Sequence, residues 1–388
     1  YFLPGGFVLS NETRGYRHLY YDNYEGQLIN QLTSGNWEID QVFGESNGKL
    51  YFSSTQKSIF NRAVYKVGLD GKRKIIVSDK GVNTVHISPN GAFLVNSNSS
   101  VLIPNNYKVL DSEGSFVRLI DKNQEVLDEL SNYQLPNPDY FLYENSNGDT
   151  INACFLKPVD FDSTKKYPVL VYVYGGPGHQ VLKNEYDSFN FLWHSYLTQQ
   201  GFLIALIDAR GTGGRGRQFR EQTYGKLGEL ESKDISEMAE HIKSMPFIDE
   251  NRAAIWGWSF GGYLSSLIAM QGGVFNVAIA VAPVTNWRFY DNVYAERYLG
   301  LPSVNADGYD WNSPTNIVDG LDAKYLLIHG TGDDNVHIQN SLFMQNALID
   351  ANKQFDVFYY PDRNHGIYGG NTRLHLYHLM TDYLIKYL

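Results

Sequence analysis

Three side chains that lie far apart in the sequence have the types needed for acyl transfer by a serine nucleophile. Ser259 sits in "GWSFG" (257–261), the G-x-S-x-G pattern of a tight strand-to-helix turn that lifts a serine hydroxyl above a sheet. Such a serine needs a histidine base, and the histidine needs a carboxylate to orient it. Asp333 and Asp334 in "TGDDNVH" and His365 in "PDRNHG" follow Ser259 in the order Ser, Asp, His. The residues alone leave open which aspartate acts.

The elements around these residues are expected to bring them to one edge of a sheet. Ser259, the aspartate pair and His365 each follow an apolar run. Continuous apolar strands that alternate with amphipathic helices are typical of a mostly parallel sheet covered on both faces, with ligands at the carboxyl ends of the strands. We therefore predict an α/β-hydrolase domain over residues 142–388. Its expected strands are 167–174, 201–209, 252–258, 277–283, 324–330 and 355–360, and its expected helices 231–244, 260–271, 339–352 and 374–387.

A glycine-rich loop and two further histidines are weaker candidates for a functional site. The loop "GTGGRG" (211–216) has the glycine spacing of a dinucleotide site, but the polar stretch after it is broken by Gly225 and Gly228 and does not open a helix directly. We interpret it as a loop of the hydrolase. His329 ends an apolar strand and is expected to be a satisfied core histidine or a residue that supports the site without touching substrate, whereas His194 is predicted to be an ordinary helix residue.

The first 130 residues contain a repeat. Three segments, 17–26, 62–71 and 105–114, each place an alternating strand before an acidic turn, and their final glycines Gly26, Gly71 and Gly114 lie 45 and 43 residues apart. This period is typical of a four-stranded propeller blade, with a β-sandwich as the alternative. About three blades cannot close a ring. We expect a partial β-propeller over 1–130, further blades upstream of Tyr1, and a connector at 131–141.

Composition narrows the classes of function. The 32 basic and 42 acidic residues give a net charge of -10, which repels nucleic acid and anionic membrane surfaces. The single cysteine, Cys154, excludes an intrachain disulfide, and no Cys or His spacing is typical of a metal site, so we expect no cofactor. No run of about 18 apolar residues and no signal segment is present.

Several motifs together resemble one family. "WGWSFGGY" (256–263), "HGTGDDNVH" (329–337), "RNHGI" (363–367), "YDNVYAERYLGLP" (290–302) and "DARGTGGRG" (208–216) are similar to the dipeptidyl peptidase IV branch of the prolyl oligopeptidase family of serine peptidases. The resemblance covers residues 140–388, with the upstream part similar to the last propeller blades. It implies an exopeptidase that releases dipeptides or tripeptides after proline or alanine. Open alternatives are an acylaminoacyl peptidase, a prolyl endopeptidase, an esterase, or a non-catalytic hydrolase-like binding module.

The resemblance also implies roles for individual residues. Ser259 is the nucleophile, Asp333 the acid and His365 the base, while the Phe260 backbone N–H and the Tyr174 phenol hold the oxyanion. Asn335 would bind a substrate carbonyl. The implied proline pocket is lined by Phe260, Val284, Trp287, Tyr290, Tyr294 and Val336.

Phe260 departs from the family pattern, which often has tyrosine there, and this removes a phenol from the pocket rim. The resemblance places the glutamates that bind a free substrate amine in upstream blades, and these residues would set the choice between dipeptide and tripeptide release. The resemblance further implies a homodimer, peptide substrates with a free N-terminus and penultimate proline or alanine, no nucleic-acid partner, and export to the periplasm or surface of a bacterium.

Overall fold

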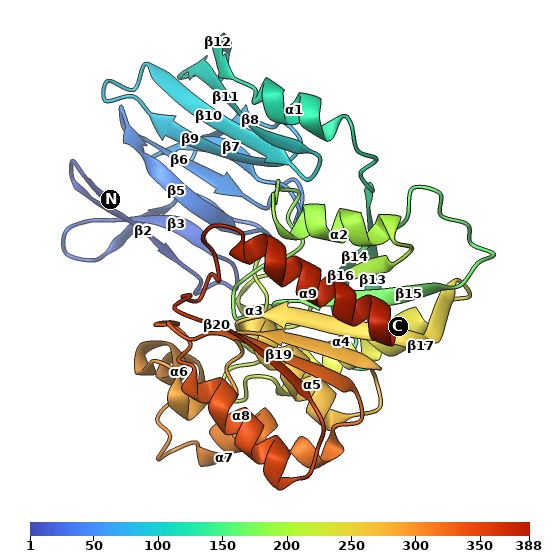
Figure 1. Cartoon of the computed structure of the whole chain (residues 1–388). Coiled ribbons are helices and arrows are strands. Elements are labelled where there is room, and N and C mark those ends of the chain that lie inside the picture. The colour runs from blue at the N-terminus through green and yellow to red at the C-terminus, as the bar shows by residue number, and fades with distance from the viewer. The chain divides into compact units, whose positions relative to one another are not determined.

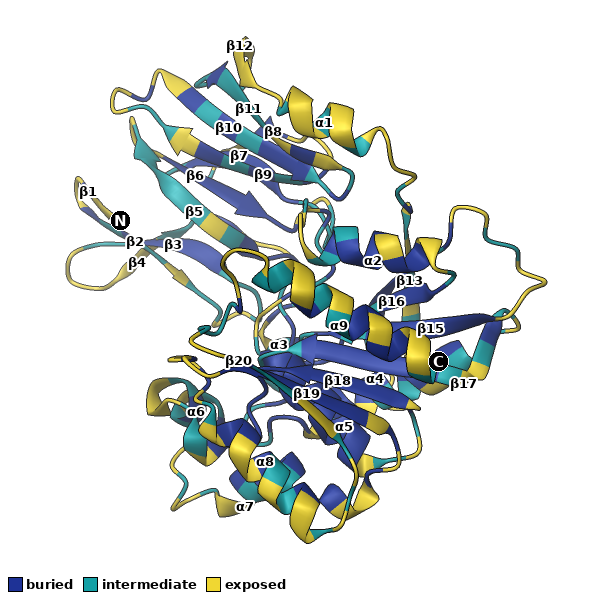
Figure 2. Ribbon diagram, in the orientation of Figure 1, coloured by how far each residue is buried: buried dark blue, intermediate teal, exposed yellow.

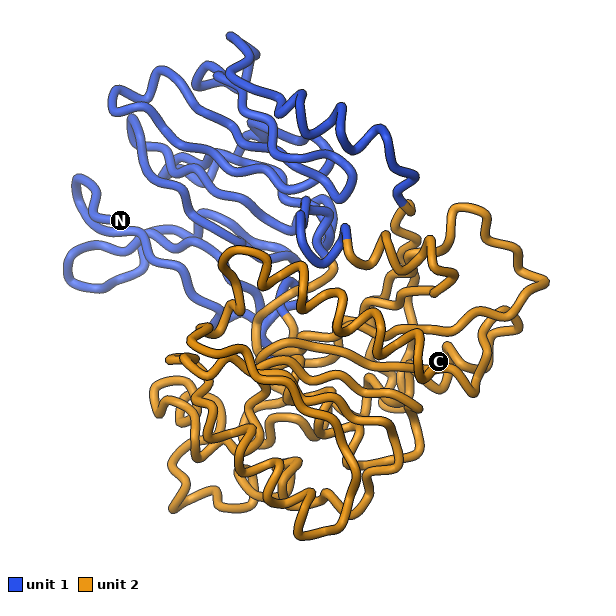
Figure 3. The backbone as a smooth tube through the Cα atoms, viewed as in Figure 1, with its two compact units in different colours: residues 1–135, 183–192, 213–220 blue, residues 136–182, 193–212, 221–388 orange.

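The computed structural model describes residues 1–388 and divides into two compact units (Figure 3). The first unit contains residues 1–135 together with the loops 183–192 and 213–220, and the second contains the rest. The predicted connector, 131–141, includes the division at 135/136 but also the start of strand β13 (Pro138–Glu144). The two loops belong to the first unit because side chains fasten them there: Asn184 bonds to Asn61 (2.9 Å), and Arg220 forms an ion pair with Glu12.

The first unit contains three four-stranded antiparallel sheets, and in each the strands pair in sequence order. This meander is the arrangement of a propeller blade, as predicted, and it differs from the two packed sheets of a sandwich. The strands are β1 (Phe2–Leu3), β2 (Gly6–Asn11), β3 (His18–Asp22) and β4 (Leu28–Gln31), then β5 (Ile39–Ser46), β6 (Lys49–Ser54), β7 (Ala63–Gly68) and β8 (Arg73–Val77), then β9 (Val82–Ile87), β10 (Phe93–Ser100), β11 (Ile103–Asp111) and β12 (Phe116–Asp121).

The glycines that reveal the repeat occupy equivalent turns. Gly26, Gly71 and Gly114 have φ angles of 78°, 75° and 91°, and each N–H closes a turn onto the carbonyl three residues earlier. A side chain is strained at such angles, which explains why glycine recurs there. Each turn joins the third and fourth strands of its sheet, so the sequence period is the period of the blades.

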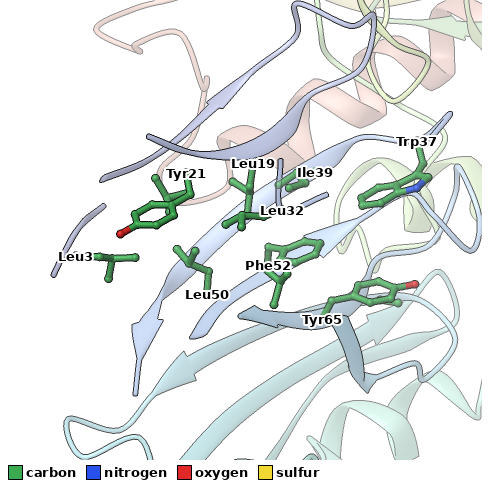
Figure 4. Packing of buried hydrophobic residues seen from close by; sticks show 12 residues of the cluster. Leu3, Leu19, Tyr21, Leu32, Trp37, Ile39, Leu50, Phe52 and Tyr65 are labelled. Carbon is green, nitrogen blue, oxygen red and sulfur yellow. The ribbon is translucent and has the colours of Figure 1, made fainter. Parts of the chain in front are cut away.

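Apolar clusters fill the space between neighbouring sheets. Leu19 of the first sheet and Leu32, which follows β4, pack with Leu50 and Phe52 from the second sheet (Figure 4). The opposite face of the second sheet contributes Val64 to a cluster with residues of the third sheet. The second sheet therefore has two apolar faces, which is the pattern that face-to-face stacking between two neighbouring sheets requires.

The second unit is built on an eight-stranded sheet with the order β13-β14-β16-β15-β17-β18-β19-β20. The first three strands pair antiparallel, and the others pair in parallel from β16 onward. The central strands are continuous buried runs, as Figure 2 shows, because both faces are covered. Besides β13, the strands are β14 (Thr150–Leu156), β15 (Tyr167–Val173), β16 (Leu203–Asp208), β17 (Ile248–Trp258), β18 (Val277–Val281), β19 (Lys324–Gly330) and β20 (Asp356–Tyr360).

Helices cover both faces of this sheet (Figure 1). α2 (Asn190–Gln199) and α9 (Thr372–Tyr387) pack together through Trp193 and Tyr377, whose ring centroids are 5.1 Å apart. α4 (Glu229–Lys243), α5 (Phe260–Gln271) and α8 (Gln339–Asp350) lie on the other face. The fold is the predicted α/β hydrolase preceded by part of a propeller. The remaining helices are α1 (Gln124–Leu130), α3 (Arg217–Glu221), α6 (Asn292–Leu299), α7 (Ala306–Asp310) and the 3₁₀ turns η1 (Trp287–Phe289), η2 (Pro314–Asn316) and η3 (Val318–Gly320).

The glycine-rich loop at 211–216 leads only into α3, a helix of five residues, and the backbone then turns at Gly225 and Gly228, with φ of 84° and 90°. The long helix that a dinucleotide site needs does not follow it directly. None of the helices combines the length and the apolar character needed to span a bilayer.

Candidate active site

Ser259 occupies a strained turn between β17 and α5. Its φ of 59° and ψ of -117° are unusual for a residue with a side chain, and such strain is concentrated at functional sites. The flanking glycines make the turn possible: a Cβ on Gly257 would lie 2.3 Å from the backbone of Gly261. The nucleophile elbow expected from "GWSFG" is therefore present in the backbone.

The Ser259 hydroxyl is not used to cap the helix that it precedes. A serine at a helix N-cap normally accepts a hydrogen bond from the first turn, but Ser259 makes no side-chain capping bond. Its backbone N–H is held instead by the carbonyl of Val281 in β18, at 2.8 Å. The turn thus fixes the backbone of the serine and leaves its Oγ atom available for chemistry.

Asp333 lies in the loop after β19 and is the buried member of the aspartate pair, since Asp334 is exposed. Its Oδ1 accepts the backbone N–H groups of Asn335 (3.0 Å) and Val336 (2.9 Å). Its Oδ2 lies 2.8 Å from Nδ1 of His365. Burial and contact with the histidine single out Asp333, a choice that the sequence pattern had left open.

His329 is a second histidine beside this carboxylate. It is fully buried, its Nδ1 contacts the Ser341 hydroxyl (2.6 Å), and its Nε2 lies 2.7 Å from the Val336 carbonyl and 3.2 Å from Asp333. Burial alone would raise the pKa of Asp333, but the hydrogen bonds from His329 and His365 outweigh burial and lower it below the ordinary carboxyl value. Asp333 therefore stays ionised throughout the neutral and mildly acidic range.

His365 lies in the loop after β20 with its side chain 22% exposed. Because Nδ1 is engaged with Asp333, Nε2 is the atom that remains to act as a base. No hydrogen bond joins it to Ser259 in this structure. Hydrogen bonds of this kind are often long in unliganded enzymes and tighten when substrate binds. Backbone bonds tie the histidine loop to the aspartate loop, with the Gly332 N–H donating to the Arg363 carbonyl at 3.0 Å.

The two groups predicted to bind the oxyanion, the Phe260 N–H and the Tyr174 phenol, come from segments that lie next to each other at the nucleophile elbow. Phe260 is the first residue of α5, a position whose N–H has no acceptor inside the helix. Tyr174 directly follows β15, and its ring centroid is 6.2 Å from that of Phe260. A Cβ on Gly261 would lie 2.2 Å from the Val173 carbonyl, so glycine there lets α5 approach the end of β15. Burial, and then the charge of Tyr298, raise the pKa of Tyr174, which keeps its phenol a neutral donor.

The aromatic residues proposed for the pocket form one cluster. Phe260 packs against Trp287 (5.4 Å between centroids), Trp287 stacks on Tyr294 (5.9 Å), and Tyr294 meets Tyr290 edge to face (5.3 Å). The Tyr290 hydroxyl donates to Asn335 Oδ1 at 2.8 Å, which links this cluster to the aspartate loop. Val284 and Val336 are both buried. All the proposed site residues lie in the second unit.

Sequence reasoning missed several residues around the site. Tyr263 is fully buried and packs on Trp287 (5.1 Å); its place three residues after Phe260 in a helix was the available signal. His179 packs against the Tyr174 ring at 4.3 Å, and no pattern marked it. His194 is not an ordinary helix residue: it is buried, accepts the Trp256 indole N–H at 3.1 Å, and burial lowers its pKa to about 3. No group of His, Cys, Asp or Glu is arranged to hold a metal ion.

Glu231 is a buried acid behind the pocket. It lies in the first turn of α4, where Oε2 accepts the Gly228 N–H at 2.9 Å while Oε1 has no hydrogen-bond partner. Burial raises the pKa of Glu231 to about 8, although hydrogen bonds from backbone N–H groups oppose the change. The side chain is therefore protonated at neutral pH.

Replacing Glu231 with glutamine should remove the part of the pH dependence of the free energy of unfolding that comes from titration of this side chain. A glutamate in the unfolded chain titrates near pH 4.3, so between that pH and about 8 the folded state binds one more proton. The free energy of unfolding then falls as pH rises, by about 1.4 kcal/mol per pH unit for one proton. As the pH is raised from 5.5 to 8.5, we expect the free energy of unfolding of Glu231→Gln to increase by about 3 kcal/mol relative to that of the parent. Urea unfolding at several pH values measures this difference. The control is the exposed Glu240→Gln; equal slopes for all three proteins would contradict the prediction.

Profiles of known protein families match most of the chain. A profile of the prolyl oligopeptidase family matches residues 187–388, just over half of the chain. The chain belongs to the prolyl oligopeptidase family. A profile of the dipeptidyl peptidase IV N-terminal region matches residues 3–105, which confirms the resemblance to that branch.

Individual relatives extend over nearly the whole chain. A probable dipeptidyl-aminopeptidase B from Metarhizium robertsii is 36% identical over 398 residues, covering 98% of this chain and 43% of its own length. Prolyl endopeptidase FAP from Mus musculus is 34% identical and covers 97% of this chain and 51% of its own. The crystal structure of Porphyromonas gingivalis dipeptidyl peptidase 4 matches with a TM-score of 0.96 and 37% identity, covering 100% of this chain and 55% of that one. The chain thus spans about half the length of the relatives that it matches.

Proposed function

We propose that the protein containing this chain is a serine exopeptidase that releases N-terminal dipeptides after proline or alanine through an acyl-enzyme. The observation that carries the proposal is the 2.8 Å bond between His365 Nδ1 and the buried Asp333 carboxylate. This bond holds the proton on Nδ1 and leaves Nε2 to accept a proton from an alcohol. The nearby elbow supplies that alcohol in Ser259.

The chemistry follows from these positions. Ser259 Oγ attacks the carbonyl carbon of the scissile bond while His365 Nε2 takes its proton, and the tetrahedral oxyanion accepts hydrogen bonds from the Phe260 N–H and the Tyr174 hydroxyl. The intermediate expels the amine, which takes the proton from His365. Water then attacks the acyl-enzyme with His365 again as the base, which releases the acid and restores Ser259.

The aromatic cluster supports a preference for proline. Trp287 and Tyr294 present stacked rings, and the side chains around them are mostly buried and uncharged. A pyrrolidine ring fits such a surface because each methylene removed from water contributes about 0.8 kcal/mol. Alanine, which is smaller, could occupy the same space with less burial. The name of the Porphyromonas relative, dipeptidyl peptidase 4, also supports release of dipeptides.

A prolyl endopeptidase is the second candidate, because one relative at 34% identity is named as such. An exopeptidase of the proposed kind recognises a free amine, whereas an endopeptidase accepts a blocked one. The decisive comparison is hydrolysis of a Gly-Pro anilide and its N-acetylated form by the full-length enzyme. We expect the free-amine substrate to have a kcat/KM at least about 100-fold higher, corresponding to about 2.7 kcal/mol of amine recognition. Equal rates, or a preference for the blocked form, would favour the endopeptidase or an acylaminoacyl peptidase.

We also propose that the protein forms a homodimer through the β20 edge of the large sheet. Tyr360 of β20 contacts His375 of α9, and Tyr359 contacts Gln345 of α8, so the two helices flank this edge. Large exposed apolar patches on such elements favour association. Sedimentation should detect a dimer that Ile349→Glu weakens and Val304→Glu does not, since Val304 is exposed and lies outside β20, α8 and α9. The exposed apolar residues of these three elements are Leu342, Phe343 and Ile349 of α8, Val357 of β20, and Leu374 and Ile385 of α9.

A further inference from the structure

The loop that carries His365 is fastened to the nucleophile elbow by a tryptophan. The indole N–H of Trp258, the residue before Ser259, donates to the backbone carbonyl of His365 at 3.0 Å. The aspartate and histidine loops are joined by backbone bonds, but the elbow belongs to a different strand and has this side-chain bond to the histidine loop instead. The Trp258 bond therefore joins the residue before the nucleophile to the backbone of the base.

Arg373 fastens the next carbonyl of the same loop. Its Nε donates to the Gly366 carbonyl at 2.8 Å, and its guanidinium carbon lies 4.7 Å from the centroid of the Trp258 ring. Arg373 is in the first turn of α9, where a positive charge opposes the helix dipole. Arg373 also donates through Nη1 to the Tyr377 hydroxyl within α9 at 3.4 Å, but the shorter of these two bonds is the one to the histidine loop.

The loop needs such fastening because its backbone is strained. Ile367, two residues after His365, has a φ of 45° and is fully buried. A branched side chain is a clear outlier at this angle, and strain of this kind costs about 1–3 kcal/mol and persists only where surrounding contacts hold it. The two carbonyls immediately before Ile367 are those bound by Trp258 and Arg373.

We propose that Trp258 and Arg373 are positioning residues that set the distance between His365 Nε2 and Ser259 Oγ. The inference rests on the proposed function, because it concerns the same base and nucleophile. Ser259 and His365 share no hydrogen bond before substrate arrives, so the frame around them must hold the two atoms close enough to react. A misplacement of about 1 Å can cost about 100-fold in rate.

The test uses the full-length enzyme and two variants that each remove one donor. Trp258→Phe keeps an aromatic ring under Arg373 but loses the indole N–H, and Arg373→Met keeps an unbranched chain over the ring but loses Nε. We expect each to lower kcat on a Gly-Pro anilide by about 10- to 100-fold with less than about a threefold change in KM. A small fluorophosphonate reacts with the same serine but contains no peptide. We expect its rate of labelling to fall by a similar factor.

Controls separate positioning from folding and from the proposed function. Lys386→Met, an exposed change at the far end of α9, should leave both rates unchanged. A Trp258→Phe/Arg373→Met double variant should be no more than a few-fold slower than the worse single variant, since both act on one loop. If the parent enzyme is labelled and both single variants are labelled equally fast, the positioning role is wrong. If the parent itself is not labelled at Ser259, the proposed function fails instead.

Discussion

Ser259→Ala in the full-length enzyme is expected to lower kcat by about 10⁴- to 10⁶-fold, because removal of the nucleophile leaves only binding and oxyanion stabilisation. The fold should survive, since the hydroxyl makes no capping bond and the backbone N–H that anchors the turn to Val281 is retained. Substrate affinity should change little. The measurement is the rate of turnover of a Gly-Pro anilide by a preparation pure enough that a contaminating peptidase does not account for the residual rate.

Ser265→Ala is a matched control on the same helix. The Ser265 hydroxyl is buried and donates only to the Gly261 carbonyl, at 2.9 Å, so its removal should cost stability rather than catalysis. Mass spectrometry after fluorophosphonate treatment should find the label on Ser259 in the parent and in Ser265→Ala, and on no residue of Ser259→Ala. Near-normal turnover by Ser259→Ala would remove the assignment of the nucleophile.

The sequence predicted the parts of the site that depend on local pattern. Strand-end positions follow from runs of apolar residues, and parallel strands put their carboxyl ends at one edge, so the order Ser259, aspartate, His365 was enough to place three loops together. The elbow was equally visible, because the close approach of α5 to β17 requires glycine at position 257 and its close approach to the end of β15 requires glycine at position 261. These features are fixed by sterics within a few residues of chain.

The features that residue patterns alone could not give depend on packing between distant segments. Two adjacent aspartates give no local signal of which one is buried over His329, and the assignment of Asp333 came from the family resemblance. The Trp258 bond to His365 joins residues 107 positions apart. The sequence predicted that the segments 183–192 and 213–220 belong to the hydrolase domain. Contacts such as that between Asn184 and Asn61 group them with the propeller sheets instead.

Asp333→Asn tests the other half of the proposed triad, and we expect it to lower kcat by about 10⁴-fold at neutral pH, the cost of a misplaced histidine proton in a serine triad. Asparagine can offer its NH₂ group to His365 Nδ1, which then accepts and leaves the proton on Nε2. A protonated Nε2 cannot take the proton of Ser259. Because the pKa of Asp333 is held below the ordinary carboxyl value, the parent should show no loss of activity from titration of this acid near pH 4–5.

Asp334→Asn is the matched control, since it makes the same chemical change one residue away at an exposed position. We expect it to keep kcat within about twofold, because a solvated carboxylate that does not touch His365 contributes little to a buried hydrogen bond. The two variants together distinguish geometry from charge: each removes one negative charge from the same loop, so an electrostatic effect of the loop as a whole would slow both. Loss of activity in Asp334→Asn with a normal Asp333→Asn would reverse the assignment. Loss in Asp333→Asn alone would show that the orientation of His365, and not the charge of the loop, determines the rate.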